Sequence, residues 1–125
     1  MKPYAMPTAV LCAALGLVAC ASTPALKEFP QGARVPSVAE LNTALTGKSF
    51  DLGSSGGGRV DYDPDGKSVT AYFSGRGDKG TWRAQDGVVC FQFAVFTSAC
   101  NDVRFVGQEV YLKRSNGQVV QLVPR

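Results

Sequence analysis

The chain of 125 residues contains no histidine. Histidine is the usual general base near neutral pH, the usual partner of a serine or cysteine nucleophile, and a common metal ligand. Its absence excludes Ser-His-Asp and Cys-His catalysis and every zinc site that needs an imidazole. No cofactor is indicated by the remaining residues, and we expect a protein that is not an enzyme.

A clustered basic surface is also missing. The formal net charge is +3, and the longest run of basic residues is Lys113-Arg114. A nucleic-acid-binding protein normally shows a basic stripe or patch, so we expect no nucleic-acid partner.

The chain lacks an apolar run long enough for a permanent membrane-spanning helix. Its longest such stretch, Thr8 to Ala19, has 12 residues and would span about 18 Å as a helix, against about 30 Å for the hydrocarbon core. Because it follows Lys2 and the terminal amine, it has the pattern of an export signal.

Leu17-Val18-Ala19-Cys20, directly after this stretch, resembles the lipobox of bacterial lipoproteins. The resemblance implies cleavage before Cys20, lipid on that cysteine, and a membrane as partner, with several acyl chains anchoring the protein firmly. Ala21 at the next position resembles the Gram-negative pattern that is sorted to the outer membrane. We therefore expect residues 1–19 to be a signal peptide and the mature protein to face the periplasm from the outer membrane.

After the cysteine, residues 20–35 are rich in proline and polar residues and are typical of a flexible tether. The alternative is that Leu26 and Phe29 dock on the domain. Residues 36–125 form the expected globular domain, which begins with a helix from Val38 to Thr46. Ser37 and Glu40 have the spacing of a capping box, and Gly47 provides a stop.

Short stretches of strand-forming residues follow the helix, separated by turn residues such as Pro64-Asp65-Gly66, Asp86-Gly87 and Asn116-Gly117. They predict a mainly β (α+β) fold, in which the helix packs on an antiparallel meander or small barrel of about seven or eight strands. The expected strands are 49–52, 59–63, 68–74, 80–84, 88–94, 100–106, 110–113 and 119–123.

Cys90 and Cys100 lie on the two strands of one expected hairpin, with the turn centred on Val95. An exported protein with two cysteines left after lipidation is expected to join them. At the tip of this hairpin, Val95 and Phe96 are the best candidates for an exposed contact with a partner, whereas most other aromatic rings are expected in the core.

Asp61, Asp63 and Asp65 match the first half of a calcium loop, D-x-D-x-D-G. However, Tyr72 stands at the twelfth position, where a bidentate glutamate belongs. A hairpin turn is therefore the preferred interpretation, and no metal site is expected.

The order of short motifs from Ser37 to Tyr111, among them Gly80-Thr81-Trp82 and the two cysteines, resembles small exported alphaproteobacterial proteins of unknown function. The resemblance implies structural roles for Trp82, Cys90 and Cys100, and no activity.

Three functions remain open from the sequence. The first is a non-catalytic lipoprotein acting through contacts with an envelope protein or peptidoglycan. The second is a small barrel that carries a lipid or another hydrophobic ligand. The third is a hydrolase based on two carboxylates, although no spacing pairs them.

Overall fold

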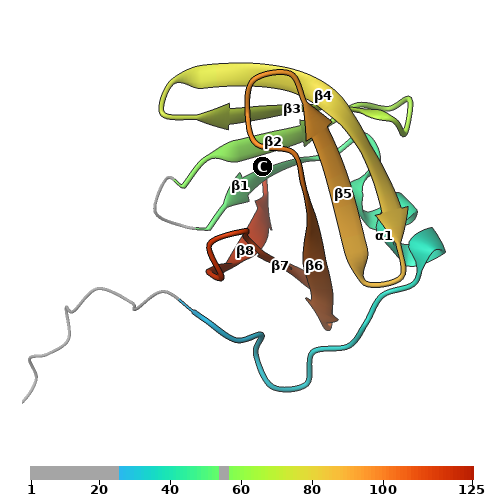
Figure 1. Cartoon of the computed structure of the whole chain (residues 1–125). Helices are drawn as coiled ribbons and strands as arrows, with labels where there is room; N and C mark the ends of the chain where they lie inside the picture. Colours follow the sequence, from blue (N-terminus) through green and yellow to red (C-terminus); the bar gives the residue numbers. More distant parts are fainter. Residues whose placement is uncertain (1–25, 54–56) are drawn as a thin grey trace, which may run out of the picture.

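The structure, a computed structural model, describes residues 26–53 and 57–125. It consists of a closed barrel of eight antiparallel strands and one helix (Figure 1). In chain order the elements are α1 Val38–Leu45, β1 Ser49–Leu52, β2 Arg59–Tyr62, β3 Ser68–Phe73, β4 Arg76–Gln85, β5 Val88–Phe93, β6 Ala99–Val106, β7 Glu109–Lys113 and β8 Val119–Pro124. The expected fold class is confirmed, in the form of the barrel rather than the open meander.

Each strand pairs with the next along the chain, and β1 closes the barrel against β8 through the pairs Phe50 with Pro124 and Leu52 with Leu122. Because the strands run alternately up and down, successive turns lie at opposite ends. The turns after β2, β4 and β6 lie at the end that α1 covers, which we call the helix end. Those after β1, β3, β5 and β7 form the other end, which we call the open end.

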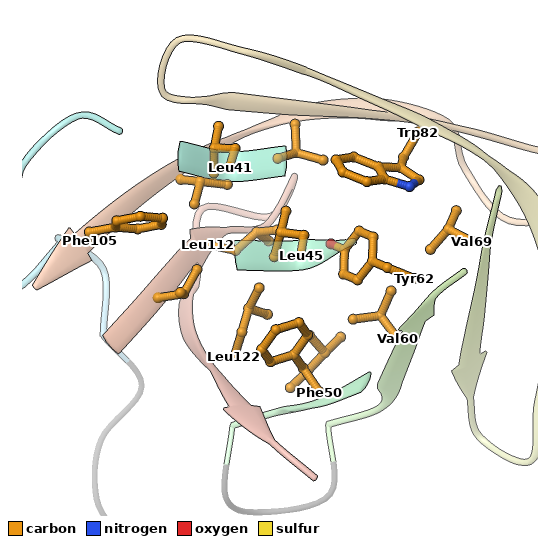
Figure 2. Packing of buried hydrophobic residues seen from close by; sticks show 14 residues of the cluster. Leu41, Leu45, Phe50, Val60, Tyr62, Val69, Trp82, Phe105, Leu112 and Leu122 are labelled. Atoms are coloured by element: carbon orange, nitrogen blue, oxygen red, sulfur yellow. The ribbon is translucent and has the colours of Figure 1, made fainter. Parts of the chain in front are cut away.

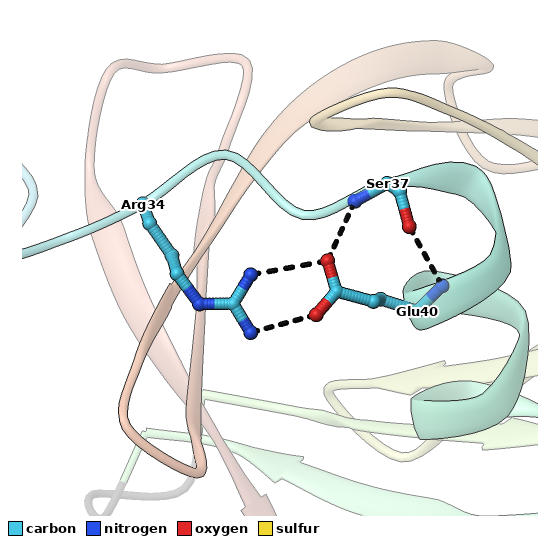
Figure 3. Close-up of polar contacts among 3 residues, drawn as sticks. All are labelled: Arg34, Ser37 and Glu40. Carbon is cyan, nitrogen blue, oxygen red and sulfur yellow. Dashed lines mark hydrogen bonds and ion pairs between the residues drawn. The ribbon is translucent and has the colours of Figure 1, made fainter.

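α1 begins with the expected capping box. The Ser37 hydroxyl accepts a hydrogen bond from the Glu40 amide at 3.2 Å, and the Glu40 carboxylate accepts one from the Ser37 amide at 3.0 Å. The same carboxylate forms a bidentate pair with the Arg34 guanidinium at 2.7 and 3.0 Å (Figure 3). Gly47, with φ of 74°, follows the helix and turns the chain into β1.

The helix places Leu41 and Leu45, both fully buried, inside its end of the barrel. Figure 2 shows them among inward-facing side chains from the strands, including Phe50, Tyr62, Trp82 and Leu122. Tyr62 and Trp82 pack edge to face, with ring centroids 5.0 Å apart, and burial raises the pKa of the Tyr62 hydroxyl. The expectation that most aromatic rings form the core is confirmed for this half of the barrel.

The strand boundaries of one hairpin differ from the expected ones. β3 ends at Phe73, and β4 begins at Arg76 instead of Gly80, so the two strands are joined by the two-residue turn Ser74-Gly75. Both turn residues have positive φ, 53° and 77°, as the tight primed turns of hairpins require. The polar residues Asp78 and Lys79, read as loop in the sequence, are paired within β4.

The segment before the helix is attached to the barrel over its described part, 26–35. The Val119 amide donates to the Leu26 carbonyl at 2.8 Å, and Arg34 and Phe105 exchange two backbone hydrogen bonds. Between these points the Arg104 guanidinium lies over the Phe29 ring, 5.2 Å from its centroid. These contacts favour the docking alternative over a free tether for residues 26–35. Leu26 is attached through its backbone while its side chain is 43% exposed, and Phe29 is attached through its ring.

The hydrogen bonds of the helix cap should make the free energy of unfolding depend on pH in the acidic range. Hydrogen bonds from Arg34 and then from the Ser37 amide lower the pKa of Glu40 from 4.5 to about 2. A carboxyl with a lowered pKa stabilises the folded state above its unfolded pKa, and this contribution is lost as the pH falls through the folded value. Glu40→Gln should therefore be less stable than the wild type above about pH 4.5, and the difference should vanish as the pH approaches about 2.

Urea unfolding midpoints measured across the acidic range check this expectation. Glu28→Gln, at an exposed position of the same segment, is the control and should follow the wild type at every pH. A difference in stability between Glu40→Gln and the wild type that does not change with pH would show that the ionised Glu40 carboxylate is not the stabilising group.

Candidate functional site: a pocket at the open end of the barrel

The open end of the barrel contains a cavity of about 590 Å³, which we call the open-end pocket. Its walls are mostly inward-facing side chains at the far ends of the strands from α1. Four aromatic rings line it, namely Phe73, Phe91, Phe93 and Phe96, and its aliphatic lining comprises Leu52, Val60, Ala71, Val95, Ala99, Leu112 and Leu122. Polar residues of the wall and rim are Arg76, Thr97, Asn101, Arg114, Ser115 and Asn116.

Strand alternation explains why these side chains meet. Residues two apart on a strand face the same side, so Val89, Phe91 and Phe93 of β5 all face inward, as their spacing predicts. Val89 is fully buried at the helix end, whereas Phe91 and Phe93 are only half-buried because they stand at the pocket. Their rings stack with centroids 5.7 Å apart.

Gly80 provides room for one of these rings. It pairs with Phe93 across β4 and β5, and a Cβ atom at Gly80 would lie 2.8 Å from the Phe93 ring and 2.1 Å from the Gln92 carbonyl oxygen. Any side chain there would displace the ring or the strand. The glycine of Gly80-Thr81-Trp82 thus allows the close approach of β5 on which this wall of the pocket depends.

The loop after β5, residues 94–98, folds over one side of the pocket. Its Phe96 ring packs edge to face on Phe73 and Phe93, with centroids 5.4 and 6.0 Å away. The carboxylate of the buried Asp78 accepts hydrogen bonds from the Val95 and Phe96 amides at 2.7 and 2.8 Å. These amides, that of Phe96 first, hold the pKa of Asp78 below its usual range.

The two residues expected to contact a partner both line the pocket. Val95 is 69% exposed at its edge, and Phe96 is half-buried in its wall. The sequence pattern located the hairpin tip, but it did not indicate that the loop folds back over an opening. The residue that holds the loop, Asp78, was not singled out from the sequence.

The disulfide between Cys90 and Cys100 is confirmed, and so is their register opposite each other. These residues lie on the strands on either side of loop 94–98, and Cys90 alternates with the inward-facing Val89 and Phe91. The bond therefore fastens the base of the loop from the outer face of the barrel. Closing a loop of this length contributes about 3 kcal/mol to stability in the chain-entropy account.

The three aspartates of the calcium-like motif do not converge. Asp61 is paired with Arg59 at 2.8 Å, and Asp63 lies 3.8 Å from the Lys79 ammonium. Asp65 accepts hydrogen bonds of 2.7 Å from the Ser68 amide, the Ser68 hydroxyl and the Lys67 amide, which in this order lower its pKa to about 2. Within residues 26–53 and 57–125, no three acidic, cysteine or histidine side chains are grouped as metal ligands would be.

Cys20 and the rest of the expected signal and lipobox lie outside the described residues. In the part of the chain that the structure describes, no helix is long and apolar enough to cross a membrane. No protein-family model matches the chain, and neither curated proteins nor solved structures gave a match.

Removing the Asp78 carboxylate should release loop 94–98. In Asp78→Ala the Val95 and Phe96 amides lose their acceptor, and we expect their hydrogen exchange to become about ten-fold faster. Exchange measured by mass spectrometry on peptides covering the loop tests this. Asp102→Ala, which removes an exposed carboxylate from β6, should leave loop exchange unchanged; equal protection in both variants would show that Asp78 does not hold the loop.

Proposed function

We propose that this protein is a lipid-anchored, non-catalytic carrier of the cell envelope, which binds a hydrophobic small molecule in the open-end pocket. The observation that carries the proposal is the pocket itself. Its volume of about 590 Å³ lies within the roughly 300–1,000 Å³ typical of small-molecule sites, which are also mainly apolar with a few polar groups. Aromatic and aliphatic walls offer a ligand the same kind of surface that a protein core offers its own side chains.

Contacts through Val95 and Phe96, the function expected first from the sequence, receive less support. Phe96 packs against Phe73 and Phe93 rather than standing free. Val95 alone presents a single exposed aliphatic side chain, and isolated exposed apolar residues are ordinary on protein surfaces.

The path of the chain before α1 supports a carrier that takes its ligand from a membrane or delivers it to one. Leu26 contacts Val119 at the start of β8, beside the turn whose residues Arg114, Ser115 and Asn116 form part of the pocket rim. The chain from Cys20 to Leu26 spans at most about 20 Å when fully extended. With lipid on Cys20, the pocket mouth would therefore stay close to the bilayer surface.

The anchor has its own test. Mass spectrometry of the protein purified from its native membrane should find Cys20 as the N-terminal residue with acyl groups attached. Cys20→Ala should abolish this modification and leave the protein in the soluble fraction. A mature N-terminus at any other residue would refute the anchor without affecting the pocket.

Binding can be tested with N-phenyl-naphthylamine, an uncharged dye whose emission rises in apolar surroundings. The wild type should bind it, and Ala71→Phe, which puts a ring into the pocket, should weaken binding about ten-fold or more. Thr70→Phe introduces the same side chain on the opposite face of β3 and should bind as the wild type does. An absence of dye binding to the folded wild type would exclude the carrier function.

A further inference from the structure

We propose that the ligand of the open-end pocket is an amphiphile with one acyl chain and an anionic head group, whose charge is held at the rim by Arg114 and Arg76. This inference rests on the proposed function and adds the chemical class of the ligand. It follows from the charges around the pocket mouth, from the lack of acidic partners for the two arginines among the described residues, and from the apolar wall below them.

The two ends of the barrel differ in the acidic residues of their turns. The described turn residues of the open end, 53, 57–58, 74–75, 94–98 and 114–118, include no acidic residue. Acidic residues do occur in turns at the helix end, at Asp63, Asp65 and Asp86. The described lining of the pocket likewise includes two arginines and no carboxylate. An anion approaching the open end is therefore attracted, and a cation is repelled.

Two carboxylates stand close to this end in the strands, and both are already engaged. Asp51, next to the end of β1, is paired with Arg125 at 2.8 Å. Asp78 accepts hydrogen bonds from the Val95 and Phe96 amides, so its charge is compensated by loop 94–98. Neither carboxylate is therefore left free to neutralise the arginines at the rim.

Neither rim arginine has an acidic partner among the described residues. The ion pairs found there involve Arg34, Arg59, Lys79 and Arg125. Arg114 is half-buried, and its guanidinium lies over the Phe73 ring, 5.4 Å from the centroid. Arg76 is exposed and pairs in register with the same Phe73. Stacking on the ring holds the Arg114 guanidinium at the mouth while leaving its N–H donors available to a ligand.

A guanidinium recognises carboxylate and phosphate through paired N–H donors. Below it, the pocket offers an apolar wall that leads down to Leu112 and Leu122, which are both buried. A ligand that satisfies both regions has a hydrocarbon tail in the barrel and an acidic group at the rim. Fatty acids and single-chain phospholipids share this chemistry.

The experiment compares laurate with dodecanol as competitors for the bound N-phenyl-naphthylamine dye. The two molecules have the same hydrocarbon length and differ in the charge of the head group. Laurate should displace the dye at a concentration about ten-fold lower than dodecanol, because hydrogen bonds to a charged acceptor are worth more than neutral ones. Dodecylamine, with a cationic head, should be the weakest competitor.

The double variant Arg76→Gln/Arg114→Gln should bind the uncharged dye as before and should lose the preference for laurate. Arg83→Gln, which removes the same charge from an exposed position of β4, should keep the preference. Arg114→Lys retains the positive charge and should keep most of the preference for laurate. If the double variant does not fold, this single variant is compared with the wild type instead.

The outcomes separate the two proposals. If the folded wild type does not bind the dye, the carrier function is excluded. Dye binding with equal displacement by laurate and dodecanol leaves the carrier function in place and overturns the anionic head group. A laurate preference that persists in the double variant also overturns it, because the arginines would not be its cause. Lysophosphatidate in place of laurate then distinguishes a phosphate head group from a carboxylate.

Discussion

The pairing of β1 with β8 is the constraint on which the rest of this structure depends. It joins Leu52 to Leu122, and Phe50 to Pro124, across more than half of the chain. Closing the sheet removes its free edges and separates an interior from an exterior. It also leaves two ends to be covered. The chain supplies one short helix for this purpose, which covers one end with the buried Leu41 and Leu45, whereas no described helix covers the other.

Three interactions hold the loop at the open end of the barrel. The disulfide joins Cys90 and Cys100 on the outer face, and Asp78 holds the amides of Val95 and Phe96. Ser98 provides the third interaction, because its hydroxyl accepts a hydrogen bond from the Phe93 amide at 2.9 Å. Together they keep loop 94–98 folded over the mouth, above a space that is lined mainly by apolar side chains.

Local chemistry explains which features the sequence could predict. The Ser37 and Glu40 cap, the Asp86-Gly87 turn and the opposition of Cys90 to Cys100 depend on residues close together in the chain, and each was predicted. The start of β4 was not, because Asp78 and Lys79 are typical of loops, whereas their pairing with Ala71 and Thr70 is decided by the register of the neighbouring strand.

The pocket depends on the strand pairing that joins the residues farthest apart along the sequence of the barrel, that of β1 with β8. Alternation along β5 predicts that Phe91 and Phe93 face one side, but an inward-facing ring can fill a core or line an opening. Which of these occurs is decided when β8 reaches β1 and α1 occupies one end only. The sequence therefore left the barrel and the meander as alternatives, and with them the choice between a carrier and a partner-binding module.

The attachment of residues 26–35 changes how an anchor at Cys20 would act on the domain. A free tether of the expected length would let the barrel turn in any direction above the bilayer. Instead, Leu26 is paired at the open end, and the segment then crosses the outside of the barrel to Arg34 near the helix end, as Figure 1 shows. With lipid on Cys20, as we propose, only residues 21–25 would separate the lipidated cysteine from the paired Leu26. The pairing of Leu26 with Val119 would then link the orientation of the pocket mouth to the position of the anchor.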